Sequence, residues 1–202
     1  MEIKKGVKFF LIWTLSNGFL IPIIYVISLI AVLLVHGSYG YTMNDWGTHR
    51  SNTMMQIAGG IVIGLGTGFL QMKLLQKQFN ISKNWITSMV VGFALAEIIA
   101  GIVLMQSDVV RGKLTIINTT NHFPEALIFA LAGLLIGLFQ WSLLRKYYTR
   151  SIFWILSSMI GWSICILITF YSQIAFIIGT TFYGALTGFT LVWVLKPIDS
   201  KT

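Results

Sequence analysis

The sequence predicts an all-α integral membrane protein with six transmembrane helices, and three observations support this fold class. Of its 202 residues, 56% are hydrophobic and only 10% are charged, and the mean hydropathy is +0.81. A soluble domain carries roughly 25% charged residues, so water is not the main solvent of this chain. The other two observations are the lengths of the apolar segments and the distribution of the basic residues.

Six apolar segments are long enough to cross a bilayer, which takes roughly 20 residues per helix. They run over Val7–Val35, Met54–Leu75, Trp85–Gln106, Phe123–Leu144, Ser151–Tyr171 and Ile174–Leu195. The first segment follows a charged start, MEIKK, but it is longer than the roughly 7–15 apolar residues of a signal peptide. We therefore expect it to remain as a helix, and we treat residues 1–202 as a single transmembrane domain.

The basic residues predict the topology. If the N terminus is placed in the cytoplasm, all but three of the 14 lysines and arginines fall on the cytoplasmic side, the exceptions being Arg50, Arg111 and Lys113. Because cytoplasmic loops are enriched in basic residues, we expect both termini in the cytoplasm and the chain in a cell membrane, such as the bacterial plasma membrane. The net charge of +8 is divided among short loops, which favours lipid headgroups as partners and not nucleic acid.

Tryptophans are also expected at the inner membrane interface, where indole rings are enriched. The five that fall there in the predicted topology are Trp13, Trp85, Trp141, Trp154 and Trp193.

One part of the chain resembles another. GLGTGFLQMKLLQK begins at Gly64 and GLLIGLFQWSLLRK begins at Gly133, and when the two are aligned without a gap, 13 of the 36 positions from Gly64 to Ile99 are identical. The last segment repeats the pattern in part as GALTGFTLVWVLK, with Leu191 in the place of the glutamine. We predict three tandem, parallel two-helix repeats over about 9–77, 82–146 and 151–196, which form a pseudo-threefold bundle.

Glycines and a glutamine recur at i, i+4 and i+7 in these segments, so they share one face of each helix. Glycines four apart let two helix backbones approach closely, and a glutamine can donate a hydrogen bond across such a contact. We therefore predict a helix-packing role for Gly64, Gly68, Gln71, Gly133, Gly137, Gln140, Gly184 and Gly188.

Glu97 is the acid that stands near the middle of a predicted span. A carboxylate there is costly unless it faces the protein interior, and Ala94 and Gly101 share its face. The equivalent position of the second repeat is Ile166, so the repeat itself does not require an acid. Two interpretations remain open: a proton, cation or substrate site, or a hydrogen-bonded structural acid.

Two further polar positions are candidates for binding. Asn17 lies at mid-depth in the first span, close to Pro22, and the two predict either a broken helix that lines a cavity or a packing kink. Tyr183 lies on a polar face of the last span with Thr180, Thr181 and Thr187. The alternative for the threonines is a hydrogen bond to their own helix backbone.

The remaining ionisable groups predict no metal site and no cofactor. The outer loops hold His36, Asp45, His49, His122 and Glu125, but no pair has the spacing of a helical zinc site. The sequence contains no nucleophile elbow, phosphate-binding loop or CxxC motif, and its single cysteine, Cys165, allows no internal disulfide. We therefore expect that the protein is not an enzyme.

Two hypotheses of function follow. The first is a small transporter or solute-binding membrane subunit, which uses the mid-depth polar groups Glu97, Asn17 and Tyr183 to bind a small solute, a proton or a cation. The second is a non-catalytic scaffold, accessory or immunity subunit, whose glycine faces bind helices of other membrane subunits or of a second copy. The first predicts polar groups that converge inside the bundle, and the second predicts glycine faces open to lipid or a partner.

Overall fold

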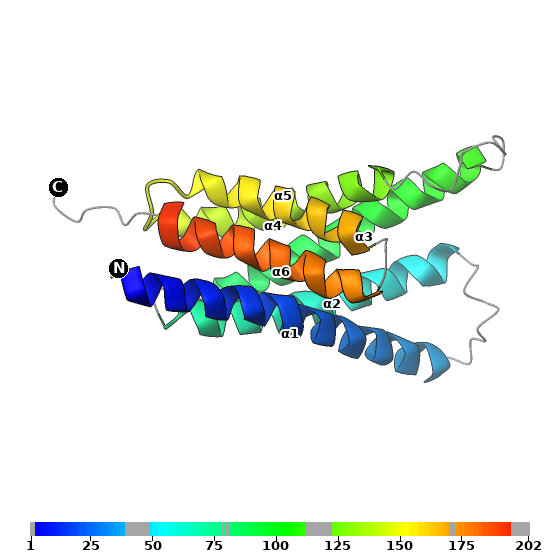
Figure 1. The fold of residues 1–202 in the computed structure, drawn as a ribbon. Coiled ribbons are helices and arrows are strands. Elements are labelled where there is room, and N and C mark those ends of the chain that lie inside the picture. The colour runs from blue at the N-terminus through cyan, green and yellow to red at the C-terminus, as the bar shows by residue number, and fades with distance from the viewer. Residues whose placement is uncertain are drawn as a thin grey trace.

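The chain folds into six long helices that lie side by side (Figure 1). The structure is a computed structural model that describes residues 3–38, 49–77, 79, 81–111, 123–169 and 173–194. The helices are α1 (Ile3–Ser38), α2 (His49–Leu75), α3 (Asn84–Arg111), α4 (Phe123–Leu144), α5 (Ile152–Thr169) and α6 (Gln173–Phe189), and α6 continues into the short π-helix η2 (Thr190–Val194). Helix α1 begins and η2 ends at the same end of the bundle.

The prediction of a helical membrane protein is confirmed at this level. Among the described residues, four helical segments are long and apolar enough to cross a bilayer: Lys4–Leu34, Ile57–Leu75, Ile152–Thr169 and Ile174–Val194. Helices α3 and α4 hold shorter apolar stretches, over Asn84–Ile99 and Phe129–Leu144.

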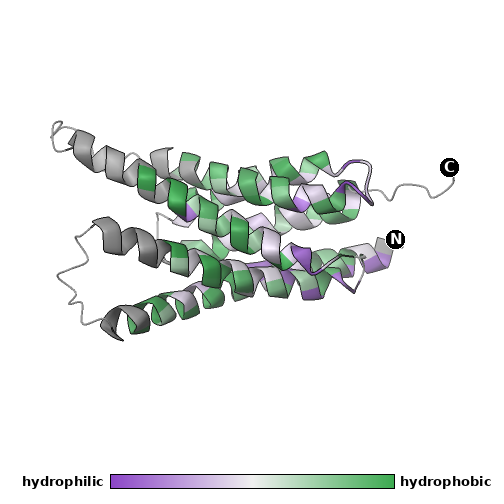
Figure 2. Ribbon diagram, turned by 180° about the vertical axis from the view of Figure 1, so that it is seen from behind, coloured by the Kyte–Doolittle hydropathy of each residue, from purple (hydrophilic) through white to green (hydrophobic). Residues whose placement is uncertain are grey.

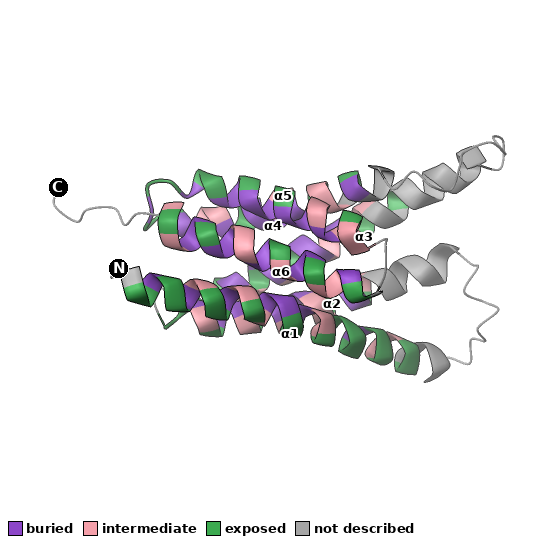
Figure 3. Ribbon diagram, viewed as in Figure 1, coloured by how far each residue is buried: buried purple, intermediate pink, exposed green. Residues whose placement is uncertain are grey.

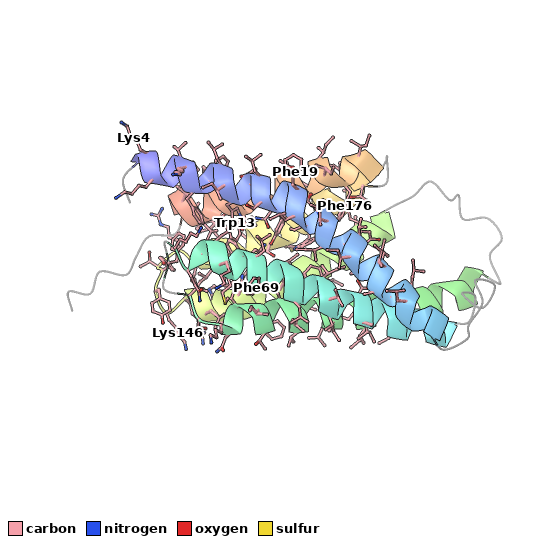
Figure 4. All side chains as sticks on the ribbon, turned by 90° about the horizontal axis from the view of Figure 1, so that it is seen from below. Lys4, Trp13, Phe19, Phe69, Lys146 and Phe176 are labelled. Atoms are coloured by element: carbon pink, nitrogen blue, oxygen red, sulfur yellow. The ribbon has the colours of Figure 1, made fainter. Side chains whose placement is uncertain are left out.

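The outer surface of the bundle is apolar, as the helices of a membrane protein require. More than half of the described residues of α1 are exposed (Figure 3). Phe19 on α1 and Phe69 on α2 are 55% and 54% exposed (Figure 4). Hydrophilic residues gather at the end where α1 begins (Figure 2). Lys4 and Lys146 both lie at that end, apart from the apolar length of the helices.

The helices close a ring. In the described part of the chain each helix packs against the next one in the sequence, and α6 packs against α1. The most extensive helix pairs are α2 with α3, α4 with α5 and α6 with α1. These pairs cross the boundaries of the hairpins predicted from the sequence, because the glycine faces of α2 and α4 point at the helix that follows and not at the helix that precedes.

Helix α1 runs without interruption through Pro22, so the broken helix considered from the sequence is not formed. Proline lacks the N–H that would bond to the carbonyl four residues earlier, which is the carbonyl of Gly18. The Thr180 hydroxyl of α6 lies 3.0 Å from that oxygen and 2.9 Å from the Phe176 carbonyl of its own helix. A neighbouring helix thus offers a donor to the backbone acceptor that Pro22 leaves free, although the single proton of Thr180 is shared with carbonyls of its own helix.

Candidate functional site

Three tryptophans, one from each odd-numbered helix, meet inside the bundle. Trp13, Trp85 and Trp154 are each 0% exposed, and the ring of Trp154 lies edge-to-face with Trp85 at 5.6 Å and with Trp13 at 6.5 Å. These three residues therefore lie in the core of the bundle and not on its lipid-facing surface. An indole can be buried fully when its N–H finds an acceptor.

Each of these indoles does find an acceptor on an even-numbered helix. Trp85 Nε1 donates to Gln71 Oε1 at 3.3 Å, and Trp154 Nε1 donates to Gln140 Oε1 at 2.8 Å. Trp13 Nε1 donates to the Thr187 hydroxyl at 3.0 Å. The three bonds join α2 to α3, α4 to α5 and α6 to α1, so they tie together the three most extensive helix pairs.

The predicted glycines lie at close backbone contacts in the first two of these pairs. A Cβ added at Gly64 would lie 2.7 Å from the Val90 Cα, and one at Gly133 would lie 2.8 Å from the Met159 Cα. Val90 and Met159 are themselves matched in the sequence alignment of the two copies. One turn further along, Gly68 faces Ile86 and Gly137 faces Ile155 in the same way, each with 3.0 Å to the Cα.

The contacts between α6 and α1 show that the register predicted for the last helix is shifted by four residues. A Cβ added at Gly184 would lie 2.9 Å from Asn17 Cβ and 3.1 Å from Thr14 Cα, which is the arrangement of Gly68 and Gly137 and not that of Gly64 and Gly133. Thr187 therefore takes the place of the two glutamines, and Leu191 does not. Gly188 lies one turn after Gly184 in α6, where an added Cβ would lie 2.9 Å from Trp13 Cδ1.

Asn17 and Tyr183, both predicted as candidate binding residues, come together with Gln71 at the centre of the bundle. All three side chains are 0% exposed. Gln71 Nε2 donates to Asn17 Oδ1 at 2.8 Å, and Asn17 Nδ2 donates to the Trp13 carbonyl at 2.7 Å. The Tyr183 side chain lies beside those of Gln71, Ser158 and Trp162, and its ring is 4.8 Å from the ring of Trp162.

We call Asn17, Gln71, Ser158, Trp162 and Tyr183 the Tyr183 cluster. The Tyr183 hydroxyl, Ser158 Oγ and Trp162 Nε1 are buried, and none of them meets hydrogen-bond geometry with a described residue. Buried polar atoms normally have a hydrogen-bond partner. A buried polar atom without a hydrogen bond costs free energy in an apolar environment. Tyr183 lies within reach of Gln71, Ser158 and Trp162, so these groups can pair with one another after a small movement or with a small bound species.

The sequence did not single out Ser158 and Trp162. They occupy the positions of Met89 and Phe93 in the other repeat, where both residues are apolar. The signal that could have found them is this exchange of an apolar for a polar side chain at a repeated core position.

Glu97 lies apart from the Tyr183 cluster. Its side chain is half-buried between α3 and α2, where a Cβ added at Gly60 would lie 2.8 Å from Glu97 Cγ. No hydrogen bond joins its carboxyl group to another residue that the structure describes. The structure thus brings together two of the three predicted polar candidates, and it places the third at a glycine contact between two helices.

Replacement of Glu97 by glutamine is expected to leave folding intact, because the amide has nearly the same size and keeps hydrogen-bonding capacity. The unfolding free energy in detergent should change by less than about 1 kcal/mol. Any pH or cation dependence of solute binding should be lost, since glutamine exchanges no proton. Binding measured across pH in both proteins tests this, and a glutamine variant with unchanged pH dependence would assign Glu97 a packing role.

An aromatic layer closes the charged end of the bundle, next to the tryptophans. Phe79, between α2 and α3, lies edge-to-face with Phe9 at 5.5 Å and with Tyr148, between α4 and α5, at 5.7 Å. Burial, together with the neighbouring Tyr147, raises the pKa of Tyr148 above its ordinary value, so the phenol stays neutral near pH 7.

Within the described residues, no three histidine, cysteine, aspartate or glutamate side chains lie together as metal ligands would. The loop candidates His36, Asp45, His49, His122 and Glu125 have side chains outside the described part of the chain. In comparisons with known proteins, the chain matches no family model, no curated protein and no solved structure.

Proposed function

We propose that the chain is a six-span membrane protein built from three related units around a pseudo-threefold axis, with both termini in the cytoplasm. The three equivalent indole bonds and the matching glycine contacts of the two aligned copies support the repeat. The described basic residues at the end where α1 begins support the orientation, because the positive-inside rule assigns that end to the cytoplasm.

Within this bundle, we propose a non-enzymatic solute-binding function, either as a small transporter or as the binding subunit of one. The observation that carries the proposal is the set of fully buried polar atoms without a described partner in the Tyr183 cluster. Buried polar groups in membrane proteins commonly mark solute or ion pathways. Asn17 and Tyr183 are the binding residues in this proposal, and Glu97 is a separate proton or cation site.

The scaffold hypothesis has less support. It requires glycine faces that are open to a partner helix, but Gly64 and Gly68 of α2 face α3, Gly133 and Gly137 of α4 face α5, and Gly184 and Gly188 of α6 face α1. A scaffold would therefore have to use another surface, such as the apolar outer face of α1.

Access to the Tyr183 cluster tests the binding function. In a Cys165→Ala background, Ser158→Cys is expected to react with a small neutral methanethiosulfonate at least about tenfold faster than Ser157→Cys. Ser157 is the matched control, because it is the preceding residue on α5, is 5% exposed and donates to the Trp154 carbonyl. The reaction can be followed by mass spectrometry on the intact protein in native membranes. Equally slow reaction of both cysteines would show a sealed core and would favour the scaffold.

A further inference from the structure

In the Tyr183 cluster the two amide oxygens are occupied, whereas three groups that can donate have no described partner. Asn17 Oδ1 accepts the bond from Gln71, and Gln71 Oε1 accepts the bond from Trp85. The side chains without a described partner are Trp162, whose Nε1 can only donate, and the hydroxyls of Ser158 and Tyr183. A ligand that pairs with Trp162 must therefore offer a lone pair, and the two hydroxyls can donate to the same ligand.

The same surplus of donors holds throughout the described core. Five buried side-chain atoms lack a partner, and none of them is restricted to accepting: Thr14 Oγ1, Gln140 Nε2, Ser158 Oγ, Trp162 Nε1 and Tyr183 OH. Gln140 Nε2 is unpaired for a structural reason. Gln71 donates to Asn17, but the residue equivalent to Asn17 on the next odd helix is Met89, which offers only a weak acceptor.

The charge in the core points the same way. Among the described residues, no aspartate, glutamate, lysine, arginine or histidine is buried, and Glu97 lies against Gly60 outside the cluster. A bound cation would find no carboxylate and no free carbonyl from these side chains. An anion would accept from N–H and O–H groups, and charge-assisted hydrogen bonds are roughly twice as strong as neutral ones.

We propose that the Tyr183 cluster binds a small inorganic anion of halide size, held by the Trp162 N–H and the hydroxyls of Ser158 and Tyr183. The inference rests on the proposed binding function and names its ligand class. Size is limited because the donors are packed into the centre of the bundle, where Ser158 and Tyr183 are 0% and Trp162 is 4% exposed. The site differs from Glu97, which remains a candidate for a proton or cation.

The charge preference of the cluster can be measured with thiol reagents of opposite charge. Ser158→Cys in the Cys165→Ala background is treated with the sulfonatoethyl and the trimethylammonium-ethyl methanethiosulfonates in detergent. The rates are divided by those of the exposed Asn84→Cys, which adjoins Lys83 and so already includes attraction to the basic end. The normalised rate of the anionic reagent is expected to exceed that of the cationic one by at least about tenfold.

Trp162 is the donor to remove. Trp162→Phe keeps an aromatic ring against Phe93, 5.2 Å away, and should bring the normalised ratio close to one. Trp193→Phe is the matched control, because Trp193 is 45% exposed on the outside of the bundle, and it should leave the ratio unchanged.

A second measurement needs no variant. The melting temperature of the intact chain in detergent is expected to rise by roughly 2–4 °C in sodium fluoride, chloride or bromide, relative to sodium gluconate of equal ionic strength, because a ligand of the folded state stabilises it. Melting temperatures that are equal in all four salts, together with equal or cation-favoured normalised rates, would overturn the anion inference. Reaction with the neutral reagent alone would also overturn it but would leave the binding function standing, whereas no reaction with any reagent would overturn both.

Discussion

Gly64→Ala is expected to destabilise the bundle by about 1–3 kcal/mol, although alanine is the better helix former by roughly 1 kcal/mol. The added Cβ would lie 2.7 Å from Val90 Cα and 3.0 Å from the Met89 carbonyl oxygen. Both are backbone atoms, so no rotamer change can make room and α2 must move away from α3. Gly133→Ala should behave alike, because its Cβ would lie 2.6 Å from the Ser158 carbonyl oxygen.

Gly59→Ala provides the control on the same helix. Its Cβ would meet only Val32 Cγ2 at 3.7 Å, an ordinary contact, so this variant should be as stable as the parent or slightly more stable. Unfolding of the three variants in detergent, followed by circular dichroism, gives the comparison. If Gly64→Ala and Gly59→Ala melt together, the close approach of α2 and α3 is not a determinant of stability.

Gln71→Leu is expected to destabilise the bundle more than Gln140→Leu, although the two glutamines occupy equivalent places. Gln71 joins two partners, because it accepts from Trp85 and donates to Asn17. Gln140 accepts from Trp154, and its own Nε2 has no described partner. Leucine at 71 thus strands an N–H and a carbonyl oxygen, whereas leucine at 140 strands one N–H. The difference should be the value of one hydrogen bond between membrane helices, which is roughly 0.6–2 kcal/mol.

The measurement is the unfolding free energy of both leucine variants and of Gln71→Leu combined with Asn17→Leu. The loss of unfolding free energy in the double variant should be smaller than the sum of the losses in the two single variants. The reason is that the unpaired Oδ1 of Asn17 is then absent. If Gln71→Leu and Gln140→Leu lower the unfolding free energy equally, the hydrogen bond from Gln71 to Asn17 contributes nothing to stability.

Sequence patterns predicted the helical membrane class, because hydropathy is a local property of a helix. The register of the last helix could not be predicted in the same way. A glycine stripe with four-residue spacing still matches after a shift of four, so Gly184 and Gly188 fit either alignment. The contacts of Gly184 with Thr14 and Asn17 decide between them, and these depend on packing between distant parts of the chain.

The burial of Trp13, Trp85 and Trp154 could not be predicted for a related reason. An indole suits the membrane interface and also suits a core that offers its N–H an acceptor. The bonds of Trp85 with Gln71 and of Trp154 with Gln140 form only in the folded bundle, where the glutamines of α2 and α4 face α3 and α5. The sequence alone does not show them. Glu97 packs against Gly60 and not beside Tyr183, which depends on how α2, α3 and α6 are arranged around the ring.

The closure of the ring by α1 and α6 has a consequence for biosynthesis. Helix α1 leaves the ribosome first, carrying the Trp13 N–H and the Gly18 carbonyl that Pro22 leaves free, and the residues that satisfy both groups, Thr187 and Thr180, are made last. The first span must therefore remain in the bilayer with unmet polar groups while helices α2 to α5 are translated. Both contacts can therefore form only after α6 has been translated.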